Sequence, residues 1–157
     1  MKAPSSALEL RLSVLLNPAE VSDVANAVLW AQSVGVPLRI RGGGHNYEGF
    51  SNGDGCLVVD VSERKGLELD EQKNLLKVGA GVTNGELYAY AGSRGYPFPG
   101  GTCPTVGVCG YATGGGWGLS CRYLGLGCDS LEELELVDFR GCTVKAGRNE
   151  NANLFWA

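Results

Sequence analysis

The chain begins with an alternation of apolar and polar residues and then changes to a helical repeat. From residue 8 to residue 14, leucine or valine at every second position alternates with a polar residue, which predicts a half-buried strand. Val21, Val24, Val28 and Leu29 follow at the spacing of one helix face, and we expect a helix there.

Local signals predict both ends of this helix. Asn17 can serve as the N-cap, Pro18 suits the first helical position, and Glu20 would complete a capping box. Gly35, followed closely by Pro37, predicts where the helix ends.

The rest of the pattern predicts short strands and one further helix. We expect strands at residues 38–41, 56–60 and 75–79, and a hairpin whose strands, 131–138 and 142–146, flank a Phe-Arg-Gly turn. Thr83 and Glu86 form a second capping-box pattern, which opens a helix that ends near Gly95. Strands and helices mixed in this order predict an α/β domain built of small layers.

Composition adds one unusual feature to this picture. The 157 residues suit a single domain, which typically has roughly 100–200. Hydrophobic residues make up 44% of the chain, enough to form a core, but 25 residues are glycine, about twice the usual share. Residues 41–55 hold six of these glycines and residues 95–127 hold eleven. The glycines therefore serve two particular segments of the backbone.

Charge and hydropathy exclude several classes of protein. The formal net charge is −4 and no run of Lys or Arg is present, which disfavours a nucleic-acid-binding protein. No stretch approaches the ~20 apolar residues of a membrane span, and the first residues lack the apolar core of a signal peptide. We expect a cytoplasmic protein that contacts neither nucleic acid nor membrane.

The six cysteines do not form a metal-binding pattern. No pair has CxxC spacing, and His45 is the only histidine, so no metal site is predicted. In a cytoplasmic chain we expect most of these cysteines to be buried thiols.

The first glycine segment follows a predicted strand and reads Arg-Gly-Gly-Gly-His-Asn over residues 41–46. Consecutive glycines allow backbone N–H groups to converge on one point and form a nest for an anion such as a phosphate. Arg39 and Arg41 add positive charge nearby. The alternative is a tight connection between strands that binds nothing.

The second glycine segment, residues 99–118, contains aromatic and β-branched residues that a flexible linker lacks. Ordering so many glycines is costly, and close passage of the backbone along a large flat ligand explains them better. No GxxxxGK[ST] motif occurs, which excludes a P-loop. GxGxxG also fails, since the stretches beginning at Gly42 and Gly79 end in Tyr47 and Asn84, and a Rossmann NAD site is disfavoured.

Four motifs resemble one known family. RGGGHNYEG (41–49), PGGTCPTVGVCGY (99–111), GGGWGLSCRYLGLGCD (114–129) and NANLFWA (151–157) resemble the berberine bridge enzyme-like branch of the vanillyl-alcohol oxidase / p-cresol methylhydroxylase (PCMH) flavoproteins. The likeness runs from about residue 12 to residue 157. It implies a PCMH-type FAD-binding domain of two small α/β subdomains, roughly residues 12–60 and 61–157, with FAD between them.

The resemblance also implies how the cofactor is held. His45 stands where the family attaches the flavin 8α-methyl group, and Cys103 stands where bicovalent members attach flavin C6, so we expect FAD bonded to both. Taken alone, His45 reads as an exposed loop histidine and Cys103 as a buried thiol. Cys109 occupies a position where many relatives have a smaller residue, and it places a second thiol near Cys103.

Further positions follow from the same resemblance. The pyrophosphate is expected at residues 41–46 and the isoalloxazine and ribityl groups at the second glycine segment, with the adenine portion near one hairpin residue. The expected cofactor-binding residues are Arg41, Gly42, Gly43, Gly44, His45, Asn46, Gly101, Thr102, Cys103, Val106, Gly107, Gly110, Gly114, Gly115, Gly116, Trp117, Gly118, Leu119 and Val137.

The resemblance implies an oxidoreductase that passes a hydride from an alcohol, such as a carbohydrate, to FAD and then to O2. Val106 stands at the family's oxygen-gatekeeper position, where valine accompanies oxidases. Family members are longer, so a substrate domain and the catalytic base are expected in a C-terminal region that these residues do not include. A flavin-binding module without catalysis, and a glycine-rich structural domain without cofactor, are the alternatives.

Overall fold

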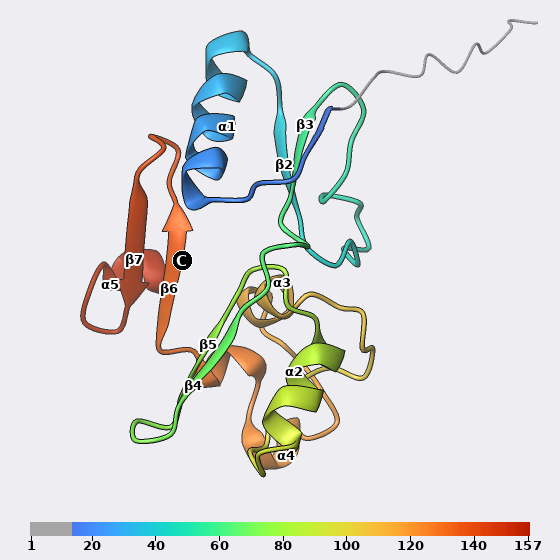
Figure 1. Cartoon of the computed structure of the whole chain (residues 1–157), viewed down its shortest axis with the longest axis vertical. Coiled ribbons are helices and arrows are strands. Elements are labelled where there is room, and N and C mark those ends of the chain that lie inside the picture. The colour runs from blue at the N-terminus through green and yellow to red at the C-terminus, as the bar shows by residue number, and fades with distance from the viewer. Residues whose placement is uncertain (1–13) are drawn as a thin grey trace, which may run out of the picture.

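A computed structural model describes residues 14–157 of the chain (Figure 1). A parallel sheet of three strands lies at one end, in the order β1 (Val14–Leu16), β3 (Leu57–Asp60) and β2 (Leu38–Arg41). β3 is buried along its whole length because it is the central strand and helix α1 (Val21–Val34) packs against it. The predicted strand at 8–14 lies outside the described residues except for its last position.

Helix α1 ends as predicted but begins differently. Gly35 adopts a left-handed conformation with φ of 70°, and its N–H bonds back to the carbonyls of Ala31 and Gln32. The prediction that Asn17 is the N-cap is wrong: Glu20 is the N-cap, and its box partner is Asp23. The Asp23 carboxylate accepts hydrogen bonds from the N–H groups of residues 19 and 20, and so fixes the later start.

The second part of the chain forms an antiparallel hairpin and a capped helix. β4 (Leu67–Asp70) pairs with β5 (Leu75–Val78), and α2 (Asn84–Gly92) follows. The sequence analysis missed β4, although it alternates between half-buried and exposed positions. The predicted Thr83–Glu86 capping box is present. Val82, Leu87, Ala91 and Val108 form a second buried cluster here.

Residues 99–130, which begin with the second glycine segment, contain short helices that were not predicted from the sequence. They are α3 (Val108–Thr113), α4 (Cys121–Leu124) and the 3-10 helix η1 (Gly127–Ser130). Glycine within and between them has a low helix propensity, so their patterns were too short to identify.

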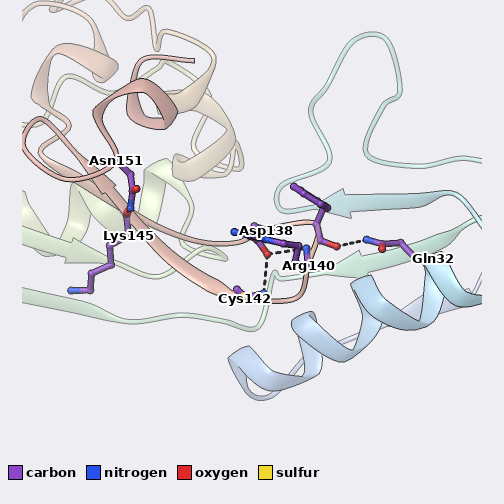
Figure 2. Close-up of polar contacts among 7 residues, drawn as sticks. Gln32, Asp138, Arg140, Cys142, Lys145 and Asn151 are labelled. Atoms are coloured by element: carbon purple, nitrogen blue, oxygen red, sulfur yellow. Dashed lines mark hydrogen bonds and ion pairs between the residues drawn. The ribbon is translucent and has the colours of Figure 1, made fainter.

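The predicted hairpin is confirmed as β6 (Glu133–Val137) and β7 (Thr143–Gly147), and it is followed by α5 (Ala152–Phe155). Its turn returns to the beginning of the chain: the Gln32 side chain on α1 donates a hydrogen bond to the carbonyl of Phe139 (Figure 2). Asp138 stabilises the turn by accepting from the N–H groups of Arg140 and Cys142. The hairpin therefore connects the C-terminal part of the chain to α1.

The expectation that most cysteines are buried is wrong. Cys56 is the only buried one of the six, all of which lie in the described part, and Cys103 and Cys142 are exposed. The exposed pair lies in a glycine-rich loop and at the hairpin, where little apolar structure covers a side chain. The confirmed fold class is α/β. In residues 14–157, no helix is long and apolar enough to cross a membrane.

Candidate functional site

Two loops that are distant in sequence meet backbone to backbone. The first follows β2 at residues 42–46, and the second precedes α3 at residues 103–107. A Cβ atom placed on Gly43 would lie 2.5 Å from the backbone nitrogen of Gly107 and 2.7 Å from the carbonyl oxygen of Thr105. Contacts this short are forbidden for a side chain, so glycine at position 43 is what allows the loops to touch.

The loop contact brings His45 and Cys103 to a common neighbour. His45 Nε2 lies 2.8 Å from Thr105 Oγ1, and Cys103 Sγ lies 3.4 Å from the same oxygen. All three side chains are exposed. The two residues predicted to carry the cofactor are therefore adjacent and open to a ligand, and the bond at Nε2 leaves the other ring nitrogen of His45 for a further partner.

The environments of Cys103 and Cys109 have opposite effects on their thiols. The hydroxyl and N–H of Thr105, with the N–H of Val106, lower the pKa of Cys103 by hydrogen bonding to its sulfur. Burial raises the pKa of Cys109. Because the thiolate is the nucleophilic form of cysteine, we expect Cys103 to be the more reactive of the two thiols.

The start of α2 holds the Cys103 loop in place. The N–H of Asn84 donates to the carbonyl of Val106 at 2.9 Å, and the N–H of Gly85 donates to the carbonyl of Pro104 at 2.8 Å. The Asn84 side chain, which is fully buried, also donates to the Cys103 carbonyl at 3.4 Å. The first turn of a helix has N–H groups without intrahelical partners, and here they bind the loop.

The His45 loop offers backbone donors. The N–H groups of residues 43–46 bond to no acceptor within residues 14–157. Beneath the loop, Arg41 Nε lies 3.5 Å from the largely buried carboxylate of Asp60, and its Nη1 lies 3.5 Å from Asn52 Oδ1. Asp60 therefore balances the positive charge of Arg41, and the N–H groups of residues 43–46 are the donors at which the predicted anion site stays a prediction.

Tyr111 organises the second glycine segment. Its hydroxyl oxygen lies 2.8 Å from the carbonyl of Pro99 and 2.7 Å from that of Gly116. Gly118 passes so close to the Gly100 carbonyl that no side chain could be present there. Many of these glycines therefore allow contact between two chain segments, whereas the sequence analysis assigned them to contact with a ligand.

The remaining predicted residues divide into three groups. Trp117 and Leu119 are 63% and 78% exposed, and added Cβ atoms at Gly110 and Gly115 would meet open space. Gly42, Gly44, Asn46, Gly101, Thr102 and Gly114 lie in the loops already described. Val137 lies apart in sequence, on β6, where it pairs with Thr143. Their cofactor contacts stay predictions.

Two residues that build the site, Asn84 and Thr105, were not predicted from the sequence. Thr105 was part of a quoted motif, but its spacing from Cys103 gave no sign of the contact with His45. Asn84 directly follows a helix cap, and a polar residue there could have indicated a bond outside the helix.

The fold and the two loops define an FAD-binding domain of the VAO/PCMH type, as comparison with known proteins shows. The model of the FAD-binding-domain family matches residues 12–147, and the chain belongs to this family. The uncharacterized FAD-linked oxidoreductase YgaK of Bacillus subtilis is 40% identical over 139 residues, which cover 86% of this chain and 31% of YgaK.

Solved structures agree with this assignment. BBE-like 1 of Physcomitrella patens matches 91% of this chain and 32% of its own, with a TM-score of 0.88 and 42% identity. A xylooligosaccharide oxidase of Myceliophthora thermophila, solved with xylobiose, matches 92% of this chain and 32% of its own, with a TM-score of 0.87 and 35% identity. The chain thus spans about a third of the length of these relatives.

Proposed function

We propose that the chain binds FAD covalently through His45 and Cys103 and forms the flavin-binding part of an oxidase that acts on alcohol groups. The observation that carries this proposal is the convergence of both side chains on Thr105, with one of them an exposed thiol of lowered pKa. An imidazole nitrogen and a thiolate are both nucleophiles suited to an electrophilic ring system. The residues present therefore fit the cofactor.

Each attachment balances in atoms and electrons. A C–N or C–S bond replaces one C–H bond and the N–H or S–H bond of the protein side chain. The two protons and two electrons released pass to O2, which becomes H2O2. O2 is therefore the co-reactant for attachment as well as the proposed acceptor during turnover.

The chain's own residues would bind and orient the cofactor. The free N–H groups of residues 43–46 suit the pyrophosphate, and the loops containing Gly101 and Gly115 suit the flat ring. When bound, FAD supplies the acceptor for a hydride. We assign the bonding roles to His45 and Cys103, and the alcohol's base to a part of the complete protein outside these residues.

The alcohol is proposed to be carried by a small molecule such as a carbohydrate. The similarity to a protein named a xylooligosaccharide oxidase supports this substrate class. We also propose a cytoplasmic location, which the six free cysteines support, because disulfides form mainly in oxidising compartments.

Acid precipitation of the chain after incubation with FAD and O2 tests the attachment. We expect one FAD per chain in the precipitate, with mass spectrometry finding it bonded to both the His45 and the Cys103 peptide. His45→Ala and Cys103→Ala should each retain FAD by the other bond, and the double variant should retain none. Colour that stays with the precipitated double variant would overturn both assignments.

Val106→Leu tests the oxygen gatekeeper without a substrate domain. The attached flavin can be reduced chemically and then mixed with O2 in a stopped-flow instrument. We expect the larger side chain to slow reoxidation at least tenfold, and Val106→Ala to keep it fast. Equal rates for the leucine and alanine variants would contradict the gatekeeper role.

A further inference from the structure

The Thr105 hydroxyl stands between the two side chains that are proposed to carry FAD. Its oxygen is 2.8 Å from His45 Nε2 and 3.4 Å from Cys103 Sγ. A hydroxyl group has one hydrogen to donate and lone pairs with which to accept. Thr105 can therefore donate its O–H to the sulfur while it accepts the N–H of the His45 ring.

We propose that Thr105 is a positioning residue that holds His45 and Cys103 side by side and, by hydrogen bonding to the Cys103 sulfur, favours its thiolate form. This inference rests on the proposed function in one respect, which is that FAD is the group attached to His45 and Cys103. The hydrogen-bonded trio itself is a property of the chain without cofactor.

The backbone fixes the position of this hydroxyl. The carbonyls of Cys103, Pro104 and Val106 all accept hydrogen bonds from the first residues of α2, and the Thr105 carbonyl faces Gly43. A β-branched side chain on a restrained backbone has few rotamers. Thr105 thus presents its oxygen to both partners although its own side chain is exposed.

Two charged side chains on the elements that hold the trio are paired with other groups. Arg41, beneath the His45 loop, pairs with Asp60, and Glu86, in the first turn of α2, pairs with Lys65. His45 is the titratable group that faces Cys103 across Thr105. The lowered pKa of Cys103 accordingly comes from hydrogen bonds, with the Thr105 side chain the largest contributor.

The step involves only a proton. The S–H bond of Cys103 breaks, its proton goes to solvent because the sulfur is exposed, and the electron pair stays on the sulfur. The Thr105 O–H then donates to the thiolate, a charge-assisted bond that is stronger than one to a neutral thiol. No oxidant or reductant is required.

The first test measures alkylation of Cys103 by iodoacetamide against pH in the chain without FAD, with mass spectrometry following the Cys103 peptide. We expect Thr105→Val to lower the rate at pH 7 by roughly three- to tenfold, because loss of the hydroxyl removes the largest contribution to the lowered pKa of Cys103 and so reduces the thiolate fraction. Thr105→Ser keeps the hydroxyl and should remain within about twofold of the original chain. Thr143→Val, on the exposed face of β7, is the matched control and should change nothing. Equal pH profiles for the valine and serine variants would overturn the proposal.

A second measurement does not depend on how the valine variant folds. His45 is the only histidine, so the Hε1 proton of its ring gives a single NMR signal that can be identified without assigning the rest of the chain. We expect this signal to change over the pH range in which Cys103 alkylation accelerates, and Cys103→Ala to abolish that change. A signal that is insensitive to Cys103 would show that the two side chains are not coupled.

Incubation with FAD separates this inference from the proposed function. We expect Thr105→Val to slow attachment at Cys103 at least threefold, and Thr105→Ser to restore it. If the original chain attaches no FAD while its alkylation still depends on Thr105, the proposed function fails and the positioning role stands. If FAD attaches at the same rate in the valine variant, the positioning role fails and the proposed function stands.

Discussion

At the residue scale, the environment of each thiol decides its reactivity. Cys103 is exposed and hydrogen-bonded to Thr105, whereas Cys109 is partly buried and its thiol lies 4.0 Å from the Gly79 carbonyl. The pKa of Cys103 is lowered and that of Cys109 is raised. Limited iodoacetamide at pH 7 should therefore modify Cys103 well before Cys109. The order is read from peptide masses, and labelling of Cys109 first would contradict the assignment of the reactive thiol.

Replacement of Asn84 should destabilise the fold at the site. Its side chain is fully buried and donates to the Cys103 carbonyl, so Asn84→Ala empties a buried position and leaves that carbonyl with the Val106 N–H as its remaining donor. We expect the free energy of unfolding to fall by about 1–3 kcal/mol, measured by urea denaturation. Asn149→Ala, at an exposed position, should change it by less than about 0.5 kcal/mol.

At the scale of elements, the cap of α2 makes stability depend on pH. Hydrogen bonds from Lys65 and then from the Thr83 N–H lower the pKa of Glu86 from 4.5 to about 2. A carboxylate with a lowered pKa in the folded state stabilises the fold above its unfolded value and loses that contribution as pH falls. The contribution is therefore complete above about pH 5 and declines between pH 4.5 and about 2.

Glu86→Gln should remove this dependence. Because Glu86 is partly exposed, we expect the variant to be less stable by about 1 kcal/mol at pH 7 and to match the original chain near pH 2. Thermal unfolding at several pH values measures the difference. Glu71→Gln, an exposed control, should leave the pH profile unchanged, and a constant gap between Glu86→Gln and the original chain would contradict the cap's role.

Substitution of Gly43 tests the contact between the His45 loop and the Cys103 loop. A methyl group at this position would clash with the backbone of residues 105–107, so Gly43→Ala should separate the loops and prevent FAD from reaching both His45 and Cys103. Gly92→Ala is the matched control, because it lies within α2 with open space around it and should stabilise the helix by about 0.5–1 kcal/mol. Unimpaired attachment at both residues in Gly43→Ala would contradict the tight loop contact.

Helix ends that depend on hydrogen bonds between residues close in sequence were predicted well. The Thr83–Glu86 box and the Gly35 C-cap each depend on hydrogen bonds over a few positions. The start of α1 was misplaced because Asp23 competes with the Asn17–Pro18 signal, and both patterns are plausible locally. The bond between His45 and Thr105 joins residues 60 apart, and no local pattern reports such a contact.

At the scale of the whole molecule, the hairpin of β6 and β7 connects the end of the chain to its first helix. Gly141 has φ of 73°, and an added Cβ would lie 2.9 Å from Leu29 Cγ on α1. Gly141→Ala should thus reduce the free energy of unfolding by about 1–3 kcal/mol, through backbone strain and the clash. Urea denaturation measures the loss.

A double variant separates the two causes. Leu29→Ala removes the side chain that the new methyl group would meet, so Leu29→Ala with Gly141→Ala should lose less than the sum of the single variants. Additive losses would show that the hairpin does not rest on α1 at this point. The division into subdomains at residue 60 remains a prediction. Because Gly141 contacts Leu29 across that division, residues 12–60 and 61–157 should be expressed separately to test it.

The meeting of the two loops also has a consequence for the unfolded chain. A cofactor bonded to both His45 and Cys103 would close a covalent ring of about 60 residues, as a disulfide between two cysteines at these positions would. Closing a ring of that size restricts the denatured ensemble and stabilises the folded state by about 4 kcal/mol in the chain-entropy model. The flavin would then be a cross-link as well as a redox centre. Attachment at both residues would require that the two loops had already come into contact.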